Sequence, residues 1–222
     1  MDACELLGRS VTPEGTDMTL LRRGTEYVIL ADGKPLMSSR MHGSEEALAA
    51  LGCERARRMD EPCVLVGGLG MGFSLRAALD LLPRGARVVL AELLPAIVEW
   101  NEGVLGPLAG HPLRDRRVEI ALGDVGETLR QGPGRFDAVL LDVDNGPTPF
   151  AQASNGSLYA NEGVERTRRA LRKDGVYALW SARRDVKFEH RLRHSGFRVE
   201  THDVRARLKK GGPRHTIFVA SL

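Results

Sequence analysis

Four glycines within six residues follow a short apolar run at positions 63–66: Gly67, Gly68, Gly70 and Gly72. The run is too short for a helix and predicts a buried strand, whereas residues 74–79 have helical spacing and good helix formers. A glycine turn at this point lets the backbone approach a ligand closely, and the helix N-terminus offers free N–H groups. The spacing differs from the dinucleotide pattern G-x-G-x-x-G, so it favours a nucleotide-type ligand other than NAD. A tight turn without a ligand uses the same residues, and this alternative stays open.

Carboxylates follow three further predicted strands: Glu92, Asp124 and Asp142, the last continuing into Val143-Asp144-Asn145. Ligands of open parallel sheets bind outside the carboxyl ends of the strands. A carboxylate only accepts hydrogen bonds, so Glu92 suits the two hydroxyls of a ribose. Asp124 can accept from an adenine amino group, with Val125 along the ring. Each carboxylate alone could be a helix cap, but their joint position predicts a nucleoside site.

Strands and helices alternate from residue 62 onward, which predicts an α/β fold with a mainly parallel sheet. The last two strands are joined only by a loop, so the sheet is expected to end with an antiparallel strand. The expected strands span residues 63–66, 87–92, 117–122, 136–142, 175–180, 197–204 and 215–220. Besides the helix after the glycines, helices are expected over 95–101, 158–171 and 186–194.

A small N-terminal element is expected ahead of this sheet. Residues 18–23 and 27–31 alternate as a β-hairpin, and Ser44 suits the N-cap of a helix that reaches Arg58. We therefore divide the chain into residues 1–58, a hairpin and helix, and residues 59–222, the ligand-binding domain. The element is either a packing cap or one wall of a substrate cleft, with His42 and Glu45 facing in. A lone histidine is more often structural.

The composition is that of a globular protein, with 222 residues, 42% of them apolar and a net charge of +3. Residues 166–214 hold sixteen Lys and Arg against five Asp and Glu, a balance more typical of solvated helix faces than of a nucleic-acid surface. Three cysteines without ligand spacing indicate neither disulfides nor a metal site. We find no signal peptide and no apolar run near the ~20 residues of a membrane span, and expect a cytoplasmic protein without a membrane or nucleic-acid partner.

The motifs VLVGGLGMG, AEL, GDV and FDAVLLD, in this order, resemble class I S-adenosylmethionine-dependent transferases. Within this class the chain is most similar to the spermidine synthase (aminopropyltransferase) branch, over residues 16–222. The doubled Gly67-Gly68, Glu92 in AEL and the segment LADGKPLMSSRMHGSEEAL carry this likeness. Tyr159 also stands where that branch commonly has an aromatic residue after its catalytic loop. The resemblance implies a Rossmann-like class I methyltransferase fold with a seven-stranded sheet.

The resemblance also implies roles for single residues. Glu92 with Leu93 would hold the cofactor ribose, Asp124 with Val125 the adenine, and Asp142 would lie beside the sulfonium. The cofactor's amino-acid or aminopropyl end would lie against the four glycines, Gly67, Gly68, Gly70 and Gly72. A small-molecule acceptor is implied, to which His42, Glu45 and Tyr159 are assigned, and dimers are frequent in this branch, so a homodimer is compatible with it.

Three departures from the branch bear on the reaction. Gly70 takes the place of an Asp that binds the amine of decarboxylated S-adenosylmethionine, the loop Asp-Ser-x-Asp-Pro reads Asp142-Val143-Asp144-Asn145-Gly146-Pro147, and a Tyr-Gln pair reads Ser44-Glu45. A glycine turn without the Asp suits the carboxylate of intact S-adenosylmethionine.

Our leading hypothesis is therefore methyl transfer from S-adenosylmethionine to a small acceptor, an amine among the candidates, by SN2 attack at the sulfonium. Asp142 would act as base with Asp144 assisting, unless the two only cap the following loop. The first alternative is a polyamine aminopropyltransferase that uses decarboxylated S-adenosylmethionine. A non-catalytic or RNA-directed relative is the third reading.

Overall fold

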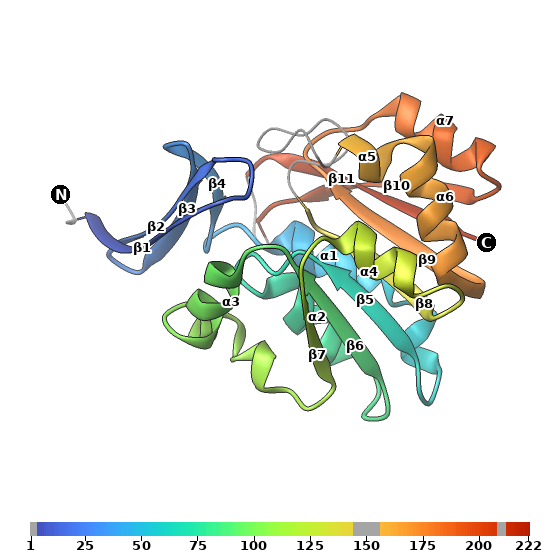
Figure 1. Cartoon of the computed structure of the whole chain (residues 1–222), viewed down its shortest axis with the longest axis horizontal. Helices are drawn as coiled ribbons and strands as arrows, with labels where there is room; N and C mark the ends of the chain where they lie inside the picture. Colours follow the sequence, from blue (N-terminus) through green and yellow to red (C-terminus); the bar gives the residue numbers. More distant parts are fainter. Residues whose placement is uncertain (1–3, 144–155, 208–211) are drawn as a thin grey trace.

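The computed structural model describes residues 4–143, 156–207 and 212–222, and its main feature is a seven-stranded sheet (Figure 1). In spatial order its strands are β10 (Arg198–Arg205), β11 (Arg214–Ser221), β9 (Leu171–Ser181), β8 (Phe136–Leu141), β5 (Cys63–Gly67), β6 (Arg87–Glu92) and β7 (Val118–Leu122). Strand β5 pairs in parallel with β6 and β8, and only β11 runs antiparallel to its neighbours. The predicted mainly parallel sheet with an antiparallel last strand is confirmed.

The central strands are apolar on both faces, as a parallel sheet covered by helices requires. All five residues of β5 are buried. Because successive side chains point to opposite faces, Val64 and Val66 join one apolar cluster, while Cys63 and Leu65 join the other. The short apolar run that predicted this strand is thus the centre of the core.

Helices cover both faces of the sheet. One face packs against α1 (Gly43–Gly52), α2 (Phe73–Leu81) and α3 (Pro95–Glu102), the other against α4 (Val125–Gln131), α6 (Asn161–Ala170) and α7 (Val186–His194). The short helix α5 (Gly156–Tyr159) precedes α6, and three 3-10 turns, η1 (Ala56–Arg58), η2 (Gly106–Ala109) and η3 (Pro112–Arg114), complete the described elements. Pro95 begins α3, as its fixed φ favours.

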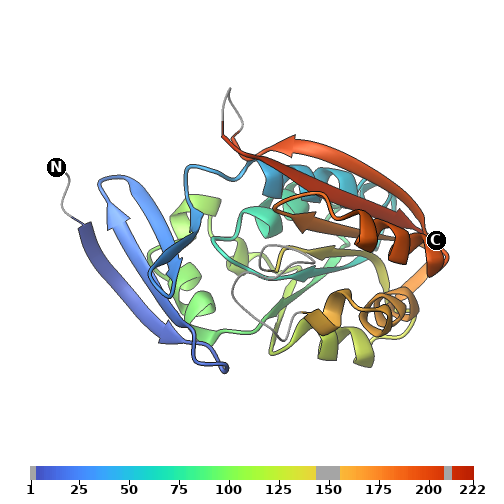
Figure 2. The same ribbon diagram turned by 90° about the horizontal axis from the view of Figure 1, so that it is seen from above.

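The N-terminal element is a four-stranded antiparallel sheet: β1 (Cys4–Val11), β2 (Asp17–Arg23), β3 (Glu26–Ala31) and β4 (Lys34–Ser38). Its centre is the predicted hairpin, β2 with β3, to which β1 and β4 add two strands that we did not predict. Figure 2 shows this sheet beside the larger one. Met18 and Ile29 from its inner face share an apolar cluster with Leu94 and Ile97, so the two sheets enclose a common interior.

Three predicted elements differ from the structure by more than one residue. The helix expected to reach Arg58 ends at Gly52, and its N-cap is His42 rather than Ser44. The helix expected over 158–171 is two helices, because Ala160 is extended and the carbonyl of Leu158 lies against Gly163. Strand β9 begins at Leu171, four residues before the strand we expected.

The large sheet and the N-terminal sheet correspond broadly to the two predicted parts, while α1 packs on the large sheet and on α2. The boundary between residues 58 and 59 stays a prediction. None of the described helices is long and apolar enough to cross a membrane.

The end of α1 provides a test of this packing. A Cβ atom on Gly52 would lie 2.1 Å from Leu140 Cδ2 and 2.9 Å from the Cβ of Ala178. We expect Gly52→Ala to lower the free energy of unfolding by about 1–3 kcal/mol, because the core is overpacked. Urea unfolding measures the change. If helix propensity dominated instead, Gly52→Ala would raise the free energy of unfolding by about 1 kcal/mol. The control is Ala50→Gly at an exposed position of the same helix, which should lower it by about the same amount.

Candidate active site

A cavity of about 850 Å³, part of it open to solvent, lies between the N-terminal sheet and the carboxyl ends of the central strands. The large sheet contributes the predicted nucleoside residues Gly68, Gly70, Glu92, Leu93, Asp124, Val125 and Asp142. The N-terminal sheet contributes Thr12, Thr16, Met18, Ile29, Leu36 and Met37. Its wall combines apolar side chains with a few polar groups, as the walls of small-molecule sites do.

Where the turn after β5 meets the end of β8, only a glycine fits. Gly68 has φ +86°, and a Cβ there would lie 2.4 Å from the backbone oxygen of Asp142. The Gly67 oxygen accepts a hydrogen bond from the Asp142 N–H at 2.8 Å. The turn and the Asp142 backbone therefore touch directly, which fixes the catalytic candidate relative to the turn.

Asn101, near the end of α3, holds the other side of the turn. Its Nδ2 donates to the carbonyl oxygens of Gly70 and Ile97, each at 2.8 Å, and its side chain is buried. Such a donor replaces the hydrogen bonds that an irregular turn cannot make within itself. The sequence analysis missed Asn101, since an Asn late in a helix gives no signal of its own.

Glu92 is held in one orientation at the end of β6. It is only 7% exposed, and its two carboxylate oxygens accept from the backbone N–H groups of Leu69 (2.8 Å) and Leu94 (2.9 Å). Glu92 also lines the cavity, where a carboxylate can accept hydrogen bonds from hydroxyl groups. The group thus combines a structural tie to the glycine turn with the acceptor surface that a ribose diol requires.

Asp124 caps a helix and also lies in the cavity wall, while its contact with a nucleobase stays a prediction. It is the N-cap of α4, where Oδ1 accepts from the Gly126 N–H at 2.5 Å, and it also lines the cavity. Val125 lies beside it and is buried. The helix cap orients the carboxylate, and the valine supplies the apolar surface on which a flat ring can lie.

A second cavity of about 300 Å³ adjoins the first and shares Met37, Gly70 and Asp142 with it. Two acidic side chains reach it, Glu45 from α1 and Asp142 from the end of β8. Asp142 accepts a hydrogen bond from Ser74 Oγ at 2.5 Å, and Ser44 Oγ lies 2.7 Å from Glu45 Oε2. The rest of the wall is mostly apolar and includes Leu69, Met71 and Phe73.

The two carboxyl groups hold protons more tightly than carboxyls in water do. Burial, and next the charge of Asp142, raise the pKa of Glu45 to about 8. Burial raises the pKa of Asp142 to about 6, against the opposing effect of the hydrogen bond from Ser74. Desolvation and a nearby like charge both disfavour the ionised form. Both carboxyls therefore titrate closer to neutral pH than carboxyls in water do.

Two predicted substrate residues lie outside both cavity walls. The His42 ring stacks on Phe73 at 4.2 Å, and its Nδ1 lies 2.8 Å from Glu46 Oε1. Tyr159 is buried, and its hydroxyl donates to the carbonyl of Val143 at 2.9 Å, which ties the chain just after Asp142 to α5. Their assignment to the substrate stays a prediction, as does that of Asp144, which lies outside the described residues.

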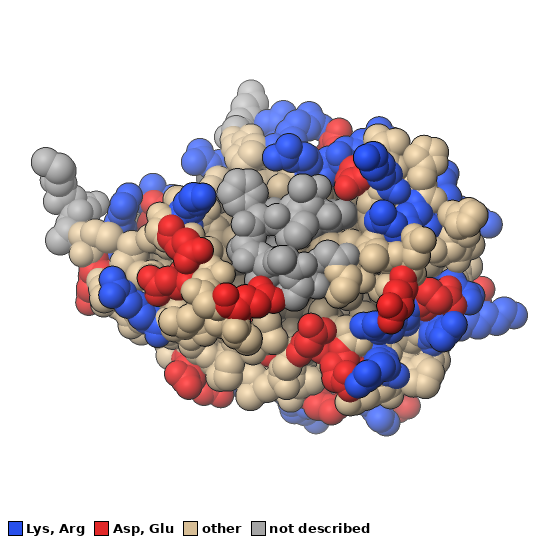
Figure 3. All heavy atoms as spheres, turned by 45° about the horizontal axis from the view of Figure 1, so that its top comes forward, with Lys and Arg blue, Asp and Glu red and all other residues tan. Residues whose placement is uncertain are grey.

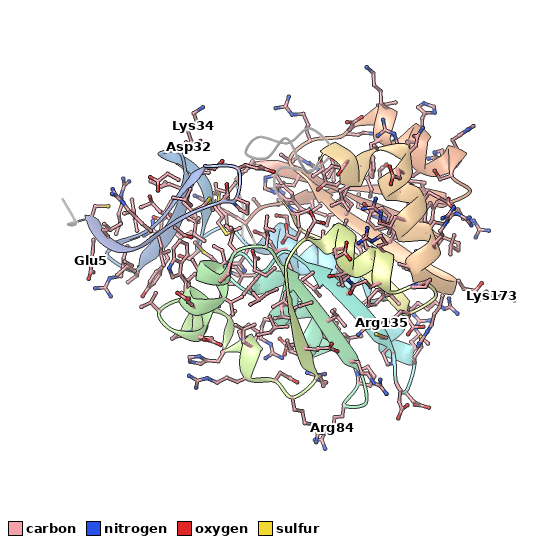
Figure 4. The ribbon with its side chains drawn as sticks, viewed as in Figure 1. Glu5, Asp32, Lys34, Arg84, Arg135 and Lys173 are labelled. Carbon is pink, nitrogen blue, oxygen red and sulfur yellow. The ribbon has the colours of Figure 1, made fainter. Side chains whose placement is uncertain are left out.

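Two carboxylates of the C-terminal third each pair with two arginines. Glu189 pairs with Arg184 and Arg193, and Glu165 pairs with Arg168 and Arg169. Figure 3 shows acidic and basic side chains on the same face. In Figure 4, Arg84, Arg135 and Lys173 lie near the amino-terminal ends of the parallel strands, whereas both cavities lie at the carboxyl ends. In the described part, no group of three or more His, Cys, Asp or Glu could hold a metal ion.

Comparison with known proteins gives sequence relatives for half of the chain. No protein-family model matches it. Over 113 residues, 51% of the chain, it is 33% identical to a polyamine aminopropyltransferase of Thermoanaerobacter pseudethanolicus, and this match covers 38% of the relative. The chain thus spans less than two fifths of that relative's length.

Solved structures share its fold over almost the whole chain. Spermidine synthase from Thermotoga maritima superposes with a TM-score of 0.76 at 18% identity, covering 97% of this chain and 72% of that one. A spermidine synthase in complex with the transition state analogue AdoDATO gives a TM-score of 0.75 with the same identity and coverage. The predicted resemblance to the spermidine synthase-like branch is therefore confirmed, as is the Rossmann-like fold with its N-terminal β-element.

The carboxyl pair makes stability depend on pH. Glu45 binds its proton more tightly in the folded chain than at its ordinary pKa of 4.5, so the folded state is favoured at low pH and loses stability as the pH rises from about 4.5 toward about 8. We expect Glu45→Gln to reduce the loss between pH 5 and pH 8 by about 1–2 kcal/mol, a figure discounted for partial exposure.

Urea unfolding at the two pH values measures this loss. The matched control is Glu162→Gln, whose wild-type side chain is 86% exposed and which should retain the wild-type pH dependence. An unchanged pH dependence in Glu45→Gln would contradict the prediction.

Proposed function

We propose that this protein transfers an aminopropyl group from decarboxylated S-adenosylmethionine to a small amine. The observation that carries the proposal is the pair Glu45 and Asp142 in a small cavity that adjoins the large cavity at the strand ends. Two carboxyls in an otherwise mostly apolar wall suit a cationic acceptor. The name of the sequence relatives, polyamine aminopropyltransferase, supports this reaction over methyl transfer, our first expectation.

The residues of the large cavity fit the proposed cosubstrate. Glu92 presents a fixed carboxylate for the ribose, and Asp124 with Val125 offers an acceptor and an apolar surface for the base. The backbone at Gly68 lies so close to Asp142 that no side chain intervenes. When bound, the cosubstrate supplies a sulfonium with an electrophilic carbon that needs no further activation.

The protein's tasks are then alignment and removal of a proton. An acceptor amine arrives as an ammonium and must lose one proton before its nitrogen lone pair can form the new C–N bond as the C–S bond breaks. Asp142 lies in both cavities and is the group we assign to take this proton. Its raised pKa brings it toward the operating pH, where a general base is most effective.

Methyl transfer from intact S-adenosylmethionine is the second candidate, and one observation favours it. Gly70 stands where the aminopropyltransferases to which the chain is similar have an Asp, and a Cβ there would lie 2.7 Å from Met37 Cε. The thioether of Met37 thus occupies the space that the Asp side chain would need. An amine at this position would lack its usual carboxylate partner.

Several further expectations stay part of the proposal. We infer a small-molecule acceptor, a cytoplasmic location and a homodimer, and no nucleic-acid partner. They follow from the resemblance and from the composition.

Calorimetric titration distinguishes the two candidates. We expect decarboxylated S-adenosylmethionine to bind at micromolar concentration and more tightly than the intact compound, because the acidic pair lies next to the glycine turn. Tighter binding of intact S-adenosylmethionine would favour the methyltransferase. Binding of neither at micromolar concentration would contradict the nucleoside site itself.

Replacing the proposed base separates chemistry from binding. We expect Asp142→Asn to lower kcat by about 10²–10⁴-fold, the usual contribution of a general base, with the Kd of the cosubstrate within a few-fold of wild type. Turnover with a diamine acceptor and calorimetry measure the two quantities. The control is Asp80→Asn, an exposed carboxylate of α2 that should leave both unchanged. A wild-type kcat in Asp142→Asn would show that Asp142 is not the general base.

A further inference from the structure

Three residues line both cavities and so form the junction between them: Met37 from β4, Gly70 from the glycine turn and Asp142 at the end of β8. Under the proposed function the cosubstrate lies in the large cavity and the acceptor in the small one. The charged chain on the sulfonium of the cosubstrate must then reach this junction. The groups that line the junction therefore decide which chain the site can take.

Met37 gives the junction an apolar wall. A Cβ atom on Gly70 would lie 2.7 Å from Met37 Cε and 3.1 Å from its Sδ, so the thioether occupies the place of a side chain at Gly70. Met37 is half-buried, pairs with Ile29 across β3 and β4, and packs against the apolar cluster that the two sheets share. A thioether has no proton to donate and is only a weak acceptor. Met37 thus covers the glycine turn at Gly70 with a group that cannot donate a hydrogen bond to an anion.

The ionisable side chains in the described walls of the two cavities are all carboxyls. Glu92 and Asp124 lie in the large cavity, Glu45 in the small one and Asp142 in both. An ammonium at the junction therefore meets the opposite charge of Asp142. A carboxylate at the same place meets a like charge and the apolar side chain of Met37, and burying a carboxylate without a partner is costly. The junction thus favours a chain that carries a cation and no anion.

Intact and decarboxylated S-adenosylmethionine differ in this anion alone. Both carry a sulfonium and a primary ammonium, and the intact compound has one carboxylate more, on the carbon that bears the ammonium. We propose that Met37 is a specificity-determining residue, which excludes this carboxylate from the junction so that the site takes the decarboxylated compound. The inference rests on the proposed function. It assigns the choice of cosubstrate to a side chain of the N-terminal sheet, across the cavity from the predicted nucleoside residues.

Calorimetry with three compounds tests this role at about pH 8, where Asp142, with its pKa of about 6, is ionised. The third compound is 5′-methylthioadenosine, which has the nucleoside and a thioether but no charged chain. We expect the wild-type protein to bind decarboxylated S-adenosylmethionine at least ~10-fold more tightly than the intact compound. Met37→Gln should reduce this ratio about 10-fold, because its amide can donate a hydrogen bond to the carboxylate. The Kd of 5′-methylthioadenosine should not change.

Two variants serve as controls for the ratio of the two affinities. Met37→Leu keeps an apolar wall, and Met59→Gln makes the same change at a half-buried position outside both cavity walls, so both should keep the wild-type ratio. A wild-type ratio in Met37→Gln would overturn the role of Met37 and leave the proposed function standing. An equal loss of affinity for all three compounds would show a merely structural role and would overturn it too. Tighter binding of the intact compound by the wild-type protein, or binding of none of the three, would contradict both the inference and the proposed function.

Discussion

The close approach of the glycine turn to the end of β8 is the contact on which the site depends. Gly68 lies against the backbone of Asp142, and Glu92 and Asn101 hold the two sides of the same turn by hydrogen bonds to its backbone. Any side chain at Gly68 would separate two strands that must be neighbours. The turn is therefore fixed from three directions, which sets the spacing of the carboxylates at the strand ends.

The acidic pair depends on a different kind of constraint. Glu45 comes from α1 and Asp142 from β8, and their approach places two carboxyls in a cavity whose wall is otherwise mostly apolar. The cost of this arrangement is reduced when one of them carries a proton, which is why both pKa values are raised. The same property lowers the stability of the folded chain as the pH rises, and under the proposed function it brings Asp142 toward the pH at which a general base acts.

The N-terminal sheet closes the site rather than merely covering the core. Its inner face contributes Met18 and Ile29 to the interior, and Met37 at the end of β4 lies above Gly70, between the two cavities. The position of Met37 links the identity of residue 70 to the N-terminal sheet. The space beside Gly70 is thus filled by a side chain that lies more than thirty positions earlier in the sequence.

The sequence determined the parallel sheet and most of the strand-end residues that line the large cavity, because the apolar runs, the glycines and the strand-end carboxylates are local signals. It did not reveal strands β1 and β4, whose residues are half exposed and follow no clean alternation. Tertiary structure alone decided that Ser44 meets His215, that Met37 meets Gly70 and that Asn101 holds the turn. These contacts join distant segments, and no spacing in the sequence encodes them. It also decided that Tyr159 and His42 lie outside the cavity walls, since the direction of a side chain depends on what packs around it.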